Sequence, residues 1–442
     1  YSIPSEYITS ELNKEVPIVE KPKELLPLGY IQAFPLCSWG FKHWGDIFTN
    51  RQIYMLDCWL RNFDTIKTAL TESDYNKCLI TFLAIWIDRI AIANTSFGVY
   101  HTGREKLERI MSRQSISMTF DYPESNPFCG KSGSAENQLE WIIKYIESEC
   151  KSAFSATLAN SSSGEKNQFA SKTLSTVVTD PPYYDAIGYA DCSDFFYVWL
   201  KRTLFDVYPL NFATPQTPKS EECTAIKHHH NDNIIEAKKH FENKLTSIFD
   251  AIESQTSDIV SIMFAHQSTE AWTTLCNSVL AARMNITGSW PMDTEMQGAL
   301  KTEMAFLESS VTVACRPAER NGFETFKRVK KAIETKVTEE VNALYELGFR
   351  GADLLTACFG QAVSEFGKYE TVEKADGSEV TVGELLELAR TAAFNALLRG
   401  FDGDEYTRFY IGWLQMNGMG DTDFDDAAKF ARVGMSIGIS DI

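Results

Sequence analysis

Apolar side chains recur at helical spacing through the first third of the chain. Residues 47–61 and 75–94 have apolar positions every three or four residues, which predicts two amphipathic helices with Asn50 and Ser73 as N-caps. The same spacing predicts a further helix over residues 135–155. We therefore expect this part of the chain to be helical.

The pattern changes beyond residue 172, where short β-branched runs alternate with amphipathic stretches. Strands are predicted at residues 174–180, 258–266, 285–290 and 309–315. Helices are predicted at residues 193–205, 234–255 and 269–283. Alternation of this kind is typical of a layered α/β domain. Beyond Pro317 the pattern becomes mostly helical, with a turn signal at residues 375–379.

These patterns divide the chain into four segments. They are an extended arm at residues 1–35, a helical segment at 36–155 that packs on the core, an α/β catalytic core at 156–316, and a mostly helical accessory region at 317–442. The chain begins with Tyr1 rather than Met, which suggests a piece of a longer protein.

Composition excludes a disordered chain and restricts how the protein can contact nucleic acid. Of the 442 residues 44% are hydrophobic, which is enough to build a core, and 60 acidic against 42 basic residues give a net charge of −18. Phosphate contacts therefore require a local basic cluster. The densest cluster, for which a solvated helix face is the alternative, is Arg316, Arg320, Lys327, Arg328, Lys330 and Lys331.

Cysteine and histidine spacing gives no metal signal. The ten cysteines include no Cys-x-x-Cys pair, which favours reduced thiols in a cytoplasmic protein over disulfides or a zinc site. The three adjacent histidines at residues 228–230 lie in a polar stretch where their side chains diverge, so no metal is predicted. No run of about 20 uncharged apolar residues is present, so no membrane span is predicted.

The most informative segment is the tetrapeptide Asp180-Pro181-Pro182-Tyr183, which follows a predicted strand. Two prolines fix two φ angles and remove two amide donors, so the loop is stiff and its carbonyls are available as acceptors. The Asp180 carboxylate and the Pro181 carbonyl suit the two hydrogens of an exocyclic amine, while Tyr183 stacks on the ring. Accepting both hydrogens draws the amine lone pair out of conjugation and makes the nitrogen more nucleophilic. The alternative is a strand-end turn with a capping carboxylate.

This tetrapeptide resembles the catalytic motif of amino-group DNA methyltransferases, which flip the target base out of the duplex and take a methyl group from S-adenosylmethionine. The longer run 180–202 and the stretches 44–52, 264–272 and 288–295 are similar to the adenine-specific DNA methylase family, described as containing a zinc ribbon and found in prokaryotic defence and restriction-modification loci. The resemblance extends from about residue 30 to about residue 440.

The resemblance implies a Rossmann-like, three-layer methyltransferase sheet with helical insertions and a helical C-terminal region. It implies an enzyme that methylates adenine in DNA, with S-adenosylmethionine as cofactor and with other proteins of a defence system as partners. Tyr184, His266 and Trp44 are expected to contact the base or shape its pocket. For His266 the alternative is a hydrogen-bonded residue at a strand end that orients the next helix. For Trp44 the alternative is a core position.

The chain departs from the family pattern in its glycines and cysteines. No Asp-Pro-Phe-x-Gly-x-Gly loop is present, and the zinc-ribbon cysteines are missing. We therefore expect a fragment that lacks the cofactor loop, or a chain whose cofactor half is supplied by another polypeptide. A non-catalytic DNA-binding or assembly subunit of a defence complex stays open as an alternative. A cytosine amine or an RNA base also stays open as the substrate, although Asp180 rather than Ser at the first motif position favours adenine.

Overall fold

The computed structural model of the protein describes most of the chain and separates it into two compact units. Residues outside the description are 1–5, 7–9, 11–13, 109, 112–114, 153, 267, 293–309, 349–353, 355–356, 399–400, 402, 420–426, 428–430 and 432–442. Unit 1 consists of Tyr1–Thr157 and Gly188–Glu222, and unit 2 of Leu158–Ile187 and Cys223–Ile442.

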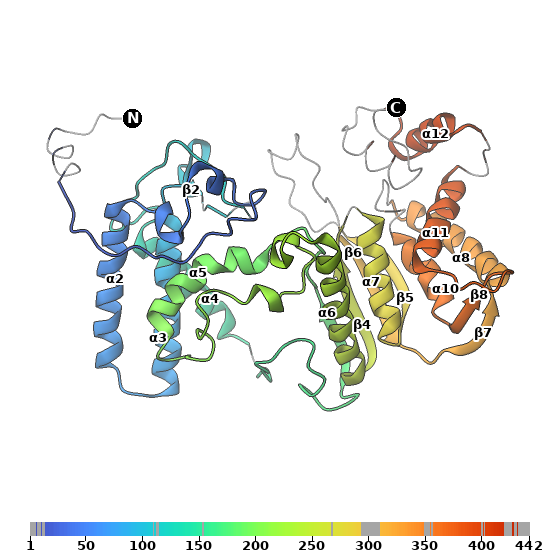
Figure 1. The fold of residues 1–442 in the computed structure, drawn as a ribbon, viewed down its shortest axis with the longest axis horizontal. Coiled ribbons are helices and arrows are strands. Elements are labelled where there is room, and N and C mark those ends of the chain that lie inside the picture. Colours follow the sequence, from blue (N-terminus) through green and yellow to red (C-terminus); the bar gives the residue numbers. More distant parts are fainter. Residues whose placement is uncertain are drawn as a thin grey trace. The chain divides into compact units, whose positions relative to one another are not determined.

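The regular structure of unit 1 is mainly helical within the described residues. Its α-helices are α2 (Asn50–Ala69), α3 (Asp74–Ala93), α4 (Ala135–Glu149) and α5 (Tyr189–Leu204) (Figure 1). Shorter elements are the antiparallel pair β1 (Val99–His101) and β2 (Lys106–Glu108), and 3₁₀ turns at Pro35–Trp39, Trp44–Ile47, Thr102–Arg104 and Lys219–Glu221. The helices predicted at residues 47–61, 75–94 and 135–155 are confirmed, with shifted bounds.

The N-caps of α2 and α3 show where local pattern was sufficient. Ser73 caps α3 as predicted, because its hydroxyl accepts the Asn76 N–H. At α2 the predicted cap Asn50 is wrong by one residue. Thr49 is the cap, since Gln52 lies three residues after it and its side chain accepts the Thr49 N–H at 2.9 Å, which completes a reciprocal capping box.

The predicted arm at residues 1–35 is packed rather than merely extended, as far as it is described. Phe34 has no exposed surface and Leu26 is 2% exposed, and both belong to the core of unit 1. The Phe34 ring meets Trp44 edge-on at 6.0 Å between centroids. The arm is therefore held by apolar burial within unit 1.

Helix α5 belongs to unit 1, although the sequence placed it in the α/β core. Its buried Phe195 and Trp199 pack against the Phe48 ring, at centroid distances of 6.2 and 5.5 Å. Phe195 also contacts Trp44. The predicted 156–316 domain is thus interrupted, because the aromatic face of α5 is buried against residues from the first hundred of the chain.

Unit 2 is a mixed α/β assembly around a four-stranded sheet. Its strands are β3 (Leu174–Thr179), β4 (Thr256–Phe264), β5 (Met284–Met292) and β6 (Ser310–Pro317), in the order β3-β4-β6-β5. β3 and β4 are parallel, and β6 is antiparallel to both β4 and β5. All four predicted strands are confirmed, within a few residues at each end.

Helices pack beside this sheet and extend the unit. They are α6 (Ile234–Gln255), α7 (Thr269–Ala281), α8 (Phe326–Glu346), α10 (Phe359–Phe366), α11 (Val382–Leu397) and α12 (Glu405–Asn417), with a 3₁₀ turn at Lys227–His230. In Figure 1, α6 and α7 lie beside the sheet, and α8, α10 and α11 form a neighbouring group. The helices predicted at 234–255 and 269–283 are confirmed.

The region 317–442 is part of unit 2 rather than a separate accessory segment. Val337 on α8 and Leu385 on α11 are fully buried in the same hydrophobic cluster as Val260 of β4. The sequence also missed a parallel pair, β7 (Asn321–Thr325) with β8 (Tyr369–Glu373). The turn signal at 375–379 is confirmed, since the Lys374 N–H bonds to the Ser378 carbonyl across Gly377, whose φ is 82°.

The helices of the described residues include none that is long and apolar enough to cross a membrane.

Candidate functional site

The carboxyl ends of β3 and β4 meet at one edge of the sheet. The two strands are parallel neighbours, with Thr179 at the end of β3 paired with Ile262 near the end of β4. Asp180 directly follows β3, and His266 stands two residues beyond β4. In open α/β sheets this edge is where ligands bind, so the sheet gathers the candidate residues at a suitable place.

The Asp180 carboxylate is exposed and already held by its own loop. The Tyr183 hydroxyl donates a hydrogen bond to Asp180 Oδ1 at 2.6 Å. The Tyr183 ring packs edge-on against Phe264, the last residue of β4, with centroids 5.8 Å apart. The tyrosine is thus fixed by the strand below it and in turn orients the carboxylate.

The loop between Asp180 and Tyr184 turns tightly through its two prolines. The Tyr184 N–H bonds to the Pro182 carbonyl at 3.0 Å, and the Ala186 N–H to the Tyr183 carbonyl at 3.1 Å. Neither of these bonds uses the Pro181 carbonyl. Pro181 itself is buried, so the availability of its carbonyl to a ligand stays a prediction.

Tyr184 is a core residue of unit 2 rather than an open stacking surface. It is 4% exposed, and its ring lies edge-on to Phe241 and His266 at 5.2 and 5.5 Å. Its φ of 59° is in the left-handed region, which a bulky residue adopts only when its surroundings hold it. Its carbonyl accepts the Ala225 N–H at 2.9 Å, which anchors the far side of the loop.

The Tyr184 hydroxyl is buried, and none of the described residues forms a hydrogen bond with it. Burial raises the pKa of this phenol above its ordinary value, and the nearby carboxylates of Glu270, Asp185 and Glu242 raise it further. The side chain therefore stays neutral, and it does not serve as a base.

His266 connects the two strand ends. Its Nε2 lies 3.3 Å from Asp185 Oδ1, and its Nδ1 lies 3.0 Å from both the backbone nitrogen and the hydroxyl of Ser268. The His266 carbonyl accepts the Trp272 indole N–H at 3.0 Å. The sequence anticipated that this ring reaches the Asp180 edge, but not that Asp185 is its partner. The position of Asp185, five residues after Asp180 in the same run, was the only signal.

Trp44 is buried in unit 1. Its ring is 1% exposed and lies edge-on to Phe34 and Phe195. This is the core position that the sequence left open as the alternative. Nothing about its surroundings in unit 1 offers the indole face to a base.

Two members of the predicted phosphate-binding cluster are engaged within the strands and loops of unit 2. Arg316 forms an ion pair with Asp258. Arg320 is half-buried and donates to the Leu280 carbonyl, and burial lowers the pKa of its guanidinium. Arg320 is therefore a structural residue, and its guanidinium is committed to a backbone carbonyl.

The rest of the cluster lies on α8. Arg328 pairs with Glu324 at 3.0 Å, and Lys330 with Glu334 at 3.9 Å. Lys327 and Lys331 stand four residues apart, exposed, and within the described residues no carboxylate pairs with either. Surface pairs such as these contribute about 1 kcal/mol at most, so a phosphate can displace them.

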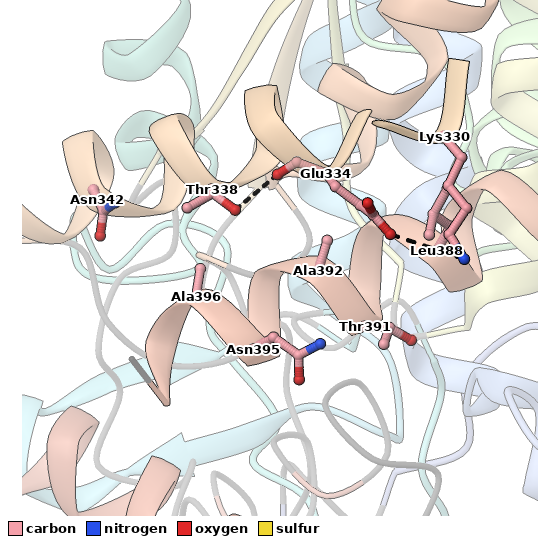
Figure 2. A pocket seen from close by; sticks show the side chains of 9 residues that line it. All are labelled: Lys330, Glu334, Thr338, Asn342, Leu388, Thr391, Ala392, Asn395 and Ala396. Carbon is pink, nitrogen blue, oxygen red and sulfur yellow. Dashed lines mark hydrogen bonds and ion pairs between the residues drawn. The ribbon is translucent and has the colours of Figure 1, made fainter. Parts of the chain in front are cut away.

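A groove of ≈ 670 Å³ lies between α8 and α11 (Figure 2). Lys330, Glu334, Thr338 and Asn342 line it from α8, and Leu388, Thr391, Ala392, Asn395 and Ala396 from α11. Figure 2 shows the Lys330 ammonium directed to Glu334, so the charged groups of the groove already neutralise one another. Its lining contains no histidine, cysteine or pair of carboxylates, and we assign no chemistry to it.

No protein-family model, curated protein or solved structure matches the chain. The candidate site is therefore defined by its own geometry.

Proposed function

We propose that the protein acts on the exocyclic amino group of adenine in DNA, as the base-binding part of an S-adenosylmethionine-dependent methyltransferase. The observation that supports this most is the Asp180–Tyr183 hydrogen bond at the carboxyl end of β3, which orients an exposed carboxylate. The Rossmann-like, three-layer arrangement belongs to this proposal. The partly parallel sheet and its adjacent helices support it.

The chain's own residues act on the amine. Asp180 accepts one amine hydrogen and the Pro181 carbonyl accepts the other, which leaves the nitrogen lone pair free to attack. Tyr183 keeps the carboxylate in place through its hydroxyl and offers its ring to the flipped base. The base must leave the duplex stack for these contacts to form.

The described residues suit the exocyclic amine of the base better than they suit the cofactor. S-adenosylmethionine supplies the methyl group when bound. Among the described residues, no loop that follows a strand of the four-stranded sheet carries the paired glycines that let a cofactor approach the backbone. This observation favours a second candidate, a DNA-binding or assembly subunit that keeps the base site but depends on a partner for the cofactor or has no methyltransferase activity.

Two measurements test the proposal. Calorimetric titration with S-adenosylmethionine separates the candidates, since binding by this chain supports a self-sufficient enzyme and its absence supports the partner-dependent subunit. Methyl transfer to duplex DNA is then measured, with the partner where one is needed, and Asp180→Ala is expected to lower it by at least about 100-fold because a preorganised acceptor for the reacting amine is removed. Activity retained in that variant, with its fold intact, contradicts the assignment. Transfer to tRNA or to cytosine instead identifies the other substrates.

A further inference from the structure

His266 has hydrogen-bond partners on both sides of its imidazole ring, and they come from different segments. Nδ1 faces Ser268, the N-cap of α7, and Nε2 faces Asp185, in the loop after β3. Residues 185 and 266 are brought together because β3 and β4 are parallel neighbours. The imidazole is therefore a bridge between the β3 loop and the start of α7.

The Ser268 contact fixes the tautomer of this bridge. A backbone N–H can only donate, and the Ser268 N–H points at Nδ1 from 3.0 Å, so Nδ1 is the acceptor. The neutral ring then carries its proton on Nε2 and donates it to Asp185 Oδ1 at 3.3 Å. Because both ring nitrogens are committed, His266 is poorly suited to bind the base itself.

The 180–185 loop, which His266 contacts, has an unfavourable backbone conformation at Tyr184. Tyr184 is kept at a φ of 59°, in a backbone region that is unfavourable for a bulky residue. Three contacts oppose that cost: the Ala225 N–H on the Tyr184 carbonyl, the His266 ring against the Tyr184 ring, and the bond between His266 and Asp185. Two of the three come from His266.

We propose that His266 is a positioning residue. Through Asp185 and the Tyr184 ring it holds the 180–185 loop in the conformation that presents the Asp180 carboxylate and the Pro181 carbonyl to the base. The orientation of the loop follows from the fold alone, whereas its role in binding the base rests on the proposed function.

The first experiment measures loop order without any assumption about activity. Hydrogen exchange is followed in peptides that cover residues 180–187, where the Tyr184 and Ala186 amides are bonded within the loop. His266→Asn keeps a short acceptor for the Ser268 N–H but does not reach Asp185, and Asp185→Ala removes the other partner. Both are expected to speed exchange by about 3- to 10-fold, the effect of losing one hydrogen bond.

Two further variants serve as controls. Asp185→Asn keeps an oxygen that accepts from Nε2 and is expected to exchange like the wild type. Glu270→Gln alters the first turn of α7, where Glu270 pairs with Lys238 rather than with His266. This variant is also expected to leave the loop unchanged. If His266→Asn and Asp185→Ala leave exchange at the wild-type rate, or if their effects add fully in the double variant, the positioning role is wrong.

The second experiment connects the loop to the base. Duplex DNA with 2-aminopurine at the target position becomes fluorescent when that base leaves the stack, and His266→Asn and Asp185→Ala are expected to weaken this signal by about the same factor, with Asp185→Asn near the wild type. Absence of the signal in the wild type contradicts the proposed function, while the exchange result still decides the positioning role. A signal unchanged in both variants, despite faster exchange, shows that the loop order does not serve base binding and overturns that half of the proposal.

Discussion

Tyr183 donates its hydroxyl hydrogen to Oδ1 of Asp180 across three residues of the same loop, at 2.6 Å. The bond fixes the orientation of the carboxylate and does not engage Oδ2. The Tyr183 ring is in turn supported edge-on by Phe264 of β4. The tetrapeptide therefore works as a preassembled unit at the end of β3.

Removing this hydroxyl is expected to lower transfer without abolishing it. Tyr183→Phe keeps the ring and the packing against Phe264 but releases Asp180, and we expect a decrease of about 5- to 10-fold in methyl transfer, or in 2-aminopurine fluorescence for a chain without cofactor. This factor corresponds to one hydrogen bond of about 1 kcal/mol. Asp180→Asn, which replaces the charged acceptor, should decrease transfer further. Equal decreases in the two variants contradict the orienting role of Tyr183.

The buried hydroxyl of Tyr184 is expected to cost stability. It has no hydrogen-bond partner in the part of the chain that the structure describes, and it lies in a side chain that is only 4% exposed. Tyr184→Phe removes the unsatisfied group and keeps the ring between Phe241 and His266, so the free energy of unfolding should rise by about 1 kcal/mol. Urea unfolding measures the change, and a decrease would show that the hydroxyl is satisfied in solution.

Asp88 gives unit 1 a pH-dependent stability. The side chain is 4% exposed, its Oδ1 has no hydrogen-bond partner among the described residues, and burial raises the pKa of the carboxyl well above its ordinary value. The pKa of the Asp88 carboxyl is higher in the folded than in the unfolded protein. Its favourable contribution to the free energy of unfolding is therefore complete below the ordinary pKa of about 4, and it is lost as the pH rises through the raised pKa.

Replacing Asp88 tests this sign. Asp88→Asn should stabilise the protein relative to the wild type, and the difference should grow with pH between about 4 and the folded pKa, by up to about 1.4 kcal/mol for each unit. Denaturant unfolding at several pH values measures it. Asp64→Asn, at an exposed position on α2, is the matched control and should give a flat difference. A difference that shrinks as pH rises contradicts the assignment.

Lys327 and Lys331 are the exposed lysines of α8 that pair with no carboxylate among the described residues, so they are the part of the basic cluster that we expect to meet phosphate. Lys327→Gln with Lys331→Gln should weaken DNA binding and make the salt dependence of the affinity less steep, by about 0.9 in the logarithmic slope for each lysine–phosphate pair removed. Lys239→Gln, on the exposed face of α6, controls for net charge. DNA affinity is measured from low to moderate salt. If the salt dependence of the affinity keeps its wild-type slope, α8 is not part of the DNA interface.

The local sequence pattern was sufficient to predict the helices and strands, but it was not sufficient to predict how they group into units. The strands β3 to β6 and the helix at 234–255 follow from β-branched runs and from apolar spacing, both of which act over a few residues. The placement of α5 in unit 1 did not follow, because its aromatic face is equally apolar whichever partner buries it. The parallel pair β7 and β8 was missed for a similar reason, since its strands are far apart in the sequence.

The sequence by itself determined which groups stand together in the Asp180-Pro181-Pro182-Tyr183 loop, because two prolines, a carboxylate and an aromatic ring lie within one turn of chain. Only the tertiary structure decided what stands around that loop. Parallel pairing of β3 with β4 brings His266 to Asp185, a neighbour 81 residues away in the chain. Such a pairing depends on which strands associate and which faces are buried, and the free energy that selects them is spread over the whole core rather than held in any single motif.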